Sequence, residues 1–145
     1  MNVFVLGTRG FPDVQGGVEK HCEELFPRLA KLGCKITVLT RSPYIKNHLR
    51  TWRGVRFIHL WVPRWKTLEA FLHTLTGVVI ARFFSPDILH INAIGPSLLA
   101  PLAKFLGMRV VVTNHGPDYE REKWGNFAKK VLKTGELVSV RFANA

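Results

Sequence analysis

A glycine-rich stretch near the amino terminus combines residue types that bind anions. It runs from Gly7 to Gly17 with the letters GTRGFPDVQGG and is followed by an apolar stripe with helical spacing. Gly16 and Gly17, at the start of that helix, let a phosphate approach bare backbone N–H groups at the positive end of the helix dipole. Arg9 is suited to a bidentate phosphate contact. The same glycines also suit a tight strand-to-helix turn, so the loop alone leaves both interpretations open.

A second set of polar residues directly follows a β-branched run later in the chain. Asn114, His115 and Gly116 come after the letters RVVVT, and Asp118 lies two residues further on. A histidine at the carboxyl end of a strand can hydrogen-bond a substrate hydroxyl or a phosphate, or transfer a proton. His115 is therefore the candidate catalytic residue, with Asn114 and Asp118 as candidates on the acceptor side. A histidine in a surface loop without chemistry is the alternative.

Two other histidines and both cysteines are expected to have structural roles. His59 and His90 lie within apolar runs and are expected to be core residues. No set of His, Cys and carboxylate residues has the spacing of metal ligands, so we predict neither a metal nor a cofactor. Cys22 and Cys34 do not make a disulfide framework and are expected to be free thiols of a reducing cytoplasm.

The charge is strongly positive, with 21 Lys and Arg against 10 Asp and Glu and a formal net charge of +11. No acidic residue occurs between Glu24 and Glu69, an interval that also contains Trp52, Trp61 and Trp65. Basic residues with tryptophan suit an anionic membrane, an acceptor that carries phosphates, or stacked single-stranded nucleic acid. A solvated basic face with its tryptophans turned inward is the competing interpretation. The residues that we expect to face anionic lipid are Arg50, Arg53, Arg64 and Lys66.

Strand and helix patterns alternate along the chain and predict an α/β fold. The predicted strands cover residues 2–6, 35–40, 55–62, 88–92 and 109–113, and the predicted helices cover 18–32, 67–84, 96–106, 120–133 and 136–144. Continuous apolar strands indicate a sheet that is covered on both faces. Strands joined through helices indicate right-handed parallel units, and the length fits one domain over residues 1–145. The expected fold is an open, doubly wound parallel sheet.

The candidate residues share one edge of this sheet if the strand order along it is 3-2-1-4-5. In such sheets ligands bind beyond the carboxyl ends of the strands, at the point where the strand order reverses. The loops Gly7 to Gly17, Asn92 to Gly95 and Asn114 to Asp118 would then face one crevice.

Several motifs resemble those of bacterial glycosyltransferases of the GT4 type. The letters GTRGFP and GGVE at residues 7–12 and 16–19 are similar to the first loop of the rhamnosyltransferase-like group in particular. The likeness continues in VVTNHG at residues 111–116 and KWGNFAKK at 123–130. The resemblance covers nearly the whole chain, although residues 42–84 contribute nothing specific to it.

The resemblance implies a GT-B fold of two Rossmann-like domains, of which this chain is the N-terminal, acceptor-side half. It also implies metal-independent transfer of a hexosyl or deoxyhexosyl group from a nucleotide-sugar, with retention at the anomeric carbon. The family's diphosphate-binding glycines map onto Gly16 and Gly17, and its sugar-contacting histidine maps onto His115. Acceptors would be cell-surface or polyprenyl-diphosphate-linked glycans of polysaccharide biosynthesis. The expected location is the cytoplasm, peripherally at the inner face of the membrane.

Two departures from the family pattern limit what can be transferred. The glutamate pair E-x7-E, which holds the donor in the family's second domain, does not occur in residues 1–145. We therefore expect a truncated enzyme that lacks its C-terminal donor-binding domain and is inactive alone. The letters DVQ at residues 13–15 stand where close relatives favour a small residue, Arg and Tyr, so acceptor recognition is not carried over.

Two other classes of protein remain as alternatives. An NAD(P)-binding oxidoreductase or epimerase needs G-x-G-x-x-G and an acid at the end of the second strand. Here the glycine spacing differs and that strand ends at Thr40 and Arg41. A basic membrane-binding or nucleic-acid-binding module explains the charge but leaves the glycine loop and His115 unused, and nucleic acid is not an expected partner.

Overall fold

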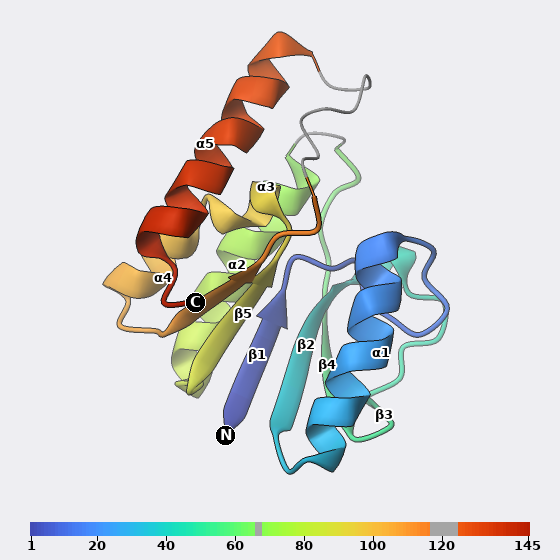
Figure 1. Ribbon diagram of the computed structural model, residues 1–145. Coiled ribbons are helices and arrows are strands. Elements are labelled where there is room, and N and C mark those ends of the chain that lie inside the picture. Colours follow the sequence, from blue (N-terminus) through green and yellow to red (C-terminus); the bar gives the residue numbers. More distant parts are fainter. Residues whose placement is uncertain (66–67, 117–124) are drawn as a thin grey trace.

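A computed structural model describes residues 1–65, 68–116 and 125–145 of the chain (Figure 1). Strands and helices alternate through most of it, as the sequence pattern predicts. In chain order the elements are β1 (Asn2–Leu6), α1 (Gly17–Lys31), β2 (Lys35–Arg41), the 3-10 helix η1 (Ser42–Tyr44), β3 (Thr51–Trp52), β4 (Val55–Leu60), α2 (Glu69–Phe84), β5 (Ile88–Asn92), α3 (Ile94–Ser97), α4 (Ala100–Phe105), β6 (Val110–Thr113) and α5 (Asn126–Phe142).

The strands form one six-stranded sheet in the order β3-β4-β2-β1-β5-β6. Every neighbouring pair is parallel except β3 and β4, which are antiparallel. For the five parallel strands this is the order on which the expected convergence of the loops depends. The two-residue strand β3 is not predicted by the sequence pattern, and it adds a short antiparallel edge beside β4.

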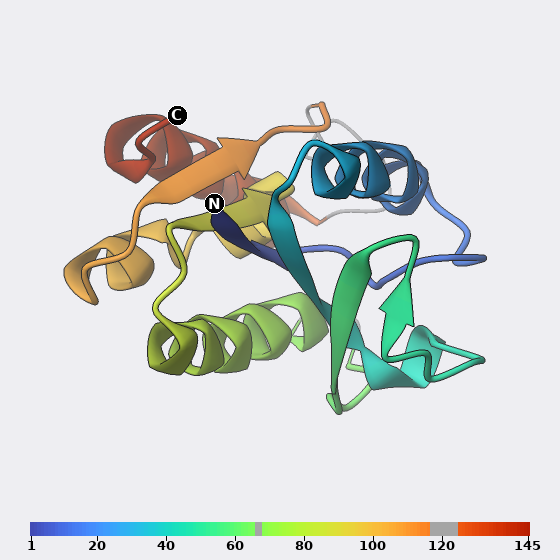
Figure 2. The same ribbon diagram turned by 90° about the horizontal axis from the view of Figure 1, so that it is seen from below.

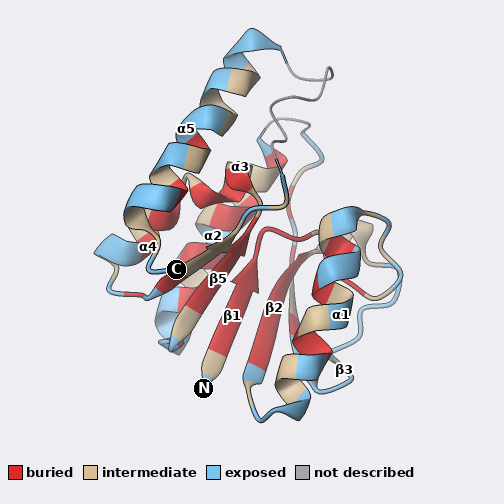
Figure 3. Cartoon of the chain, viewed as in Figure 1, coloured by how far each residue is buried: buried red, intermediate tan, exposed pale blue. Residues whose placement is uncertain are grey.

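Helices cover both faces of the sheet, as Figure 2 shows for α1 and α2 on opposite sides. Under α1, Cys22 and Phe26 pack with strand residues such as Val38 in one buried cluster. On the other face, Val78 of α2 packs with Leu39 and residues of α4 in a second cluster. The central strands are buried along most of their length (Figure 3), which confirms that their continuous apolar character reflects burial on both faces.

The two helices predicted over residues 120–133 and 136–144 are wrong as separate elements, because α5 is continuous from Asn126 to Phe142. Residues 120–124 lie outside the described part of the chain. Gly135 does not end a helix here. A side chain at Gly135 would place its Cβ 2.5 Å from the Ile94 carbonyl oxygen, so the glycine permits close packing of α5 on α3.

The single helix predicted over residues 96–106 is also wrong, because two short helices, α3 and α4, replace it. Ser97, the last residue of α3, donates hydrogen bonds from Oγ to the carbonyl oxygens of Ile94 (2.6 Å) and Gly135 (2.9 Å). Pro101 then lies in the first turn of α4, where the proline ring suits a helix start. The third predicted strand ends earlier than expected, at Leu60.

Candidate functional site

The edge at which the sequence predicts a crevice is where β1 and β5 run side by side and their connections lead to opposite sides of the sheet. A Cβ on Gly7, which follows β1, would lie 1.9 Å from the carbonyl oxygen of Asn92 at the end of β5. Gly7 also has a φ of +91°, so glycine is needed for conformation as well as for space. The strand order reverses at this point, and the predicted convergence of loops at the carboxyl edge is confirmed.

A buried carboxylate holds the first loop in place. Glu19, in the first turn of α1, is only 4% exposed. Its Oε1 accepts hydrogen bonds from the backbone N–H of Arg9 (3.0 Å) and from Nε of Arg9 (3.3 Å). Arg9 also donates from Nη2 to the carbonyl oxygen of Gln15 (3.0 Å). The guanidinium predicted to bind phosphate therefore also ties the two ends of the loop together, and its phosphate contact stays a prediction.

Gly16 and Gly17 begin α1 as the sequence predicts, but they differ in what surrounds them. Gly16 has a φ of +149°, and a Cβ there would lie 2.0 Å from Oε2 of Glu19. No described atom lies within 4 Å of a Cβ placed on Gly17. Gly16 is therefore required by the turn itself, whereas Gly17 leaves the surface over the first turn of α1 open to a ligand.

We expect replacement of Glu19 by glutamine to destabilise the fold by about 1–3 kcal/mol. The change removes the negative charge that pairs with Arg9, and it replaces one of the two buried carboxylate oxygens by an amide nitrogen, which cannot accept a hydrogen bond. Glu24→Gln is the matched control. Glu24 makes an exposed ion pair with Arg28 (3.1 Å), so its loss should cost about 0.5 kcal/mol or less. Urea unfolding of both variants at pH 7 measures the difference, and equal midpoints would contradict the holding role of Glu19.

His115 follows β6 and meets two other elements at the crevice. Its Nε2 lies 3.0 Å from Oδ1 of Asn92, the last residue of β5. Its ring also contacts that of His21 on α1, with centroids 5.0 Å apart and planes at 71°. Neither Asn92 nor His21 is identified as a site residue by the sequence, although His21 stands one helical turn after Gly17 and Asn92 ends a strand. The predicted catalytic residue is thus held beside the opening of α1.

His90 has the core role that its position in an apolar strand predicts, whereas His59 is only half-buried. Nε2 of His90 lies 2.7 Å from the Thr113 hydroxyl, and its ring contacts that of Phe26. Burial, and then the nearby His21 and His115, lower the pKa of His90 to about 4, so this ring is neutral at physiological pH. His59 bonds the Thr40 hydroxyl through Nδ1 and the Leu49 carbonyl oxygen through Nε2.

Asn114 is exposed and turns its side chain toward neighbouring backbone and α5. Its Oδ1 accepts a hydrogen bond from the N–H of Gly116 (2.9 Å), and its Nδ2 lies 3.5 Å from Oε1 of Glu136. These contacts brace the segment that carries His115. Asp118, the other predicted acceptor-side residue, lies outside the described residues.

A polar cluster beyond β2 is not anticipated from the sequence. Glu69, at the start of α2, accepts hydrogen bonds from Nη1 of Arg41 and from the Tyr44 hydroxyl, both at 2.9 Å. The guanidinium carbons of Arg9 and Arg64 lie 5.4 and 5.3 Å from the centre of the Tyr44 ring. Burial and the Glu69 carboxylate raise the pKa of Tyr44. The cluster joins the first loop to η1 and to the start of α2.

The four basic residues predicted to share one membrane-facing surface do not do so. Arg53 lies in the turn between β3 and β4, at the amino edge of the sheet, whereas Arg64 follows β4 at the carboxyl edge. Arg50 lies beside β4, where its carbonyl oxygen accepts from the N–H of Phe57. Lys66 lies outside the described residues. The expected basic face is therefore divided between the two edges of the sheet.

The tryptophans are divided in the same way. Trp61 and Trp65 at the carboxyl edge are 75% and 60% exposed. Trp52 is half-buried and packs against Phe11, with Arg53 stacked on its ring. Of these three tryptophans, the two exposed ones are therefore those near Arg64 in the sequence.

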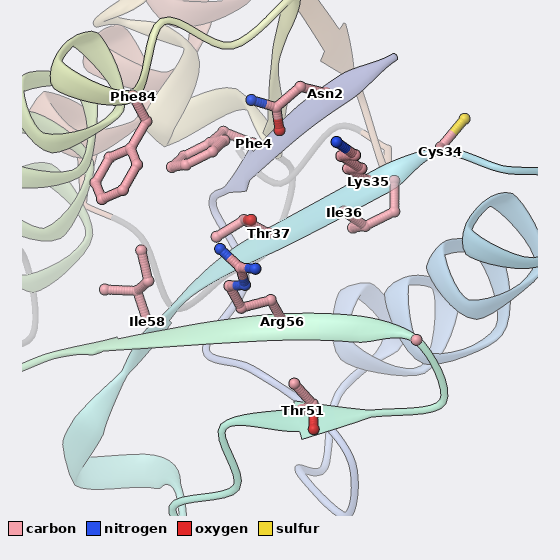
Figure 4. Close-up of a pocket in the computed structure, with 11 residues that line it drawn as sticks. Asn2, Phe4, Cys34, Lys35, Ile36, Thr37, Thr51, Arg56, Ile58 and Phe84 are labelled. Carbon is pink, nitrogen blue, oxygen red and sulfur yellow. The ribbon is translucent and has the colours of Figure 1, made fainter.

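A hollow at the opposite edge lies beside the amino ends of β1, β2 and β4 (Figure 4). Phe4 and Phe84 lie side by side on one flank, and Arg56 and Lys35 extend over it. As far as the structure describes the chain, its lining includes no carboxylate and no imidazole. The titratable groups of its lining are Cys34, Lys35 and Arg56.

The two cysteines and the possible metal ligands can be located among the described residues. Cys22 is buried and Cys34 half-buried, and both are free thiols, as predicted. Burial raises the pKa of the Cys22 thiol to about 12, so it is not an activated nucleophile. Within residues 1–65, 68–116 and 125–145, no three His, Cys, Asp or Glu side chains are grouped to hold a metal ion.

The doubly wound sheet, with a glycine turn opening its first helix and a histidine facing it from the last strand, is a Rossmann-like domain of the kind that forms half of a GT-B fold. The family comparison agrees: residues 15–144 match the model of Glycosyltransferase Family 4. The chain belongs to that family, and it is a glycosyltransferase domain that acts on a sugar donor and an acceptor. No curated protein matches the sequence.

Proposed function

We propose that the chain is the N-terminal, acceptor-side domain of a retaining glycosyltransferase that uses a nucleotide-sugar and no metal. The transferred group is a hexosyl or deoxyhexosyl residue. The observation that carries this proposal is the contact of His115 with His21 of α1 in a member of Glycosyltransferase Family 4. His21 lies one helical turn after Gly17, where α1 begins. The resemblance to the rhamnosyltransferase-like group of bacteria gives the narrower assignment.

The donor diphosphate would bind over the first turn of α1. Free backbone N–H groups and the helix dipole favour an anion there, and the open space at Gly17 lets one approach. Negative charge grows on the diphosphate as the sugar leaves, so fixed N–H donors stabilise the transition state more than the ground state. His115 would contact a hydroxyl of the transferred sugar, and Arg9 would add a contact to phosphate through N–H groups that Glu19 does not occupy.

A second domain would complete the donor site. The donor-holding pair E-x7-E is not present in residues 1–145, and correct orientation of two substrates provides roughly 7–11 kcal/mol of barrier reduction in well-aligned cases. We expect purified residues 1–145 to transfer no sugar from any nucleotide-sugar, whereas the same domain joined to a donor-binding domain should be active. Product analysis with a panel of donors tests this, and turnover by residues 1–145 alone would contradict the two-domain proposal.

The acceptor would be a cell-surface or polyprenyl-diphosphate-linked glycan at the inner face of a bacterial membrane, as in polysaccharide biosynthesis. No helix in the described part of the chain is long and apolar enough to cross a bilayer. Peripheral contact would use the carboxyl-edge residues Trp61, Arg64 and Trp65, of which Arg64 lies over the ring of Tyr44. Exposed tryptophan with a basic residue is typical of a membrane interface.

Arg64→Gln should weaken binding to anionic vesicles about fivefold at low salt, since one basic residue near such a surface contributes about 1 kcal/mol. Arg53→Gln removes the same charge from the amino edge and should have a smaller effect. Co-sedimentation with vesicles of varied anionic lipid content, at low and high salt, measures both variants. Equal losses, or no binding of the wild type at low salt, would refute contact through the carboxyl edge.

A further inference from the structure

Asn92 is a buried polar residue at the crevice to which the proposed function assigns no task. It ends β5 and is completely buried. Its Nδ2 lies 3.3 Å from the carbonyl oxygen of Leu6 in the neighbouring strand β1, and its Oδ1 lies 3.0 Å from Nε2 of His115. Because a carbonyl oxygen only accepts hydrogen bonds, Leu6 requires the amide nitrogen on its own side. The amide oxygen of Asn92 therefore faces His115.

This orientation determines which nitrogen of His115 carries the proton. The amide oxygen is an acceptor, so Nε2 of His115 must donate to it. In the neutral imidazole the other nitrogen, Nδ1, then has no hydrogen and acts as an acceptor. We propose that Asn92 is a positioning residue that holds the ring of His115 in the Nε2–H tautomer. The sugar contact of His115 belongs to the proposed function, whereas the tautomer does not depend on it.

His21 supports the same arrangement from the other side. Its ring lies across that of His115 at 71°, with centroids 5.0 Å apart. A 180° rotation of the His115 ring about its Cβ–Cγ bond would put Cε1 where Nε2 now donates to Asn92. Packing against His21 holds the plane of the His115 ring, and the hydrogen bond to Asn92 then selects one of the two flipped orientations within that plane.

Among the described residues, titratable groups near His115 lie on three elements. They are His21 on α1, His90 on β5, which is neutral, and Glu136 on α5, which the Asn114 side chain contacts. The amide of Asn92 adds no charge to this set. An aspartate at position 92 would put a carboxylate against Nε2–H and stabilise the imidazolium form of His115.

The test is an NMR pH titration of residues 1–145 with 15N-labelled histidine, in the wild type, Asn92→Asp and Asn114→Asp. The wild type should show His115 as a single Nε2–H tautomer. Asn92→Asp should raise the pKa of His115 by about 1 unit or more. Asn114→Asp is the matched control, because it adds the same charge next to His115 in the sequence but on an exposed side chain, and its shift should be less than half as large.

An Nδ1–H tautomer or a mixture of tautomers in the wild type would overturn the proposal, as would equal shifts in the two variants. If Asn92→Asp does not fold, the wild-type tautomer decides by itself. No substrate is present, so the result is independent of the glycosyltransferase assignment. A confirmed tautomer in an enzyme that keeps its activity without His115 would refute the sugar contact and leave the positioning by Asn92 intact.

Discussion

Replacement of His115 by alanine should lower the kcat of the complete enzyme by about 10²–10⁴. His115 is the imidazole that Asn92 and His21 hold beside the start of α1, so its loss removes a contact made in the transition state. An interaction made mainly there affects kcat and kcat/KM together and changes KM little. Steady-state kinetics with saturating acceptor, together with the unfolding midpoint of the variant, separates loss of catalysis from loss of folding.

His48→Ala is the matched control for this measurement. The rings of His48 and His59 have the same geometry as those of His21 and His115, with centroids 5.0 Å apart and planes at 71°, but they lie beside β4 and away from α1. Removal of His48 should therefore leave kcat within about twofold, in the range of surface changes that cost less than ~0.5 kcal/mol. If His115→Ala keeps a kcat near that of the wild type, His115 has only a structural role.

Gly7→Ala should destabilise the domain by more than about 3 kcal/mol, a large share of the 5–15 kcal/mol typical of a folded domain. The new Cβ would lie 1.9 Å from the Asn92 carbonyl oxygen and 2.8 Å from the carbonyl carbon, so backbone would have to move. β1 and β5 pair directly at this point, and Asn92 also bonds to His115. The substitution should therefore disturb the candidate site together with the sheet.

Gly33→Ala separates the steric clash from backbone strain. Gly33 has the same φ of +91° as Gly7, but no described atom lies within 4 Å of the position that a Cβ on Gly33 would take. Strain alone should cost roughly 1–2 kcal/mol, the penalty of a left-handed conformation for an L-residue. The difference between the two variants in urea unfolding therefore measures the close approach of β1 and β5. Equal destabilisation would show that this approach is not tight.

The amino-acid sequence by itself determines the parallel sheet and the start of α1. Burial on both faces requires continuous apolar strands, and a phosphate-accessible turn into a helix requires glycine, so local composition carries both features. The strand order inferred from this pattern brings the loops after β1, β5 and β6 to one edge, where the structure has them. His115 can be named from its position after a β-branched run.

The partners of these residues depend on tertiary structure. Arg9 pairs with Glu19, and Asn92 with His115, across separations of 10 and 23 residues that carry no periodic pattern. Gly135 lies inside α5 because the backbone of α3 comes close to it, a contact that no local propensity encodes. Arg53 and Arg64 are near in sequence but lie at the two ends of β4, because an extended strand carries the chain about 3.3 Å per residue from one edge of the sheet to the other.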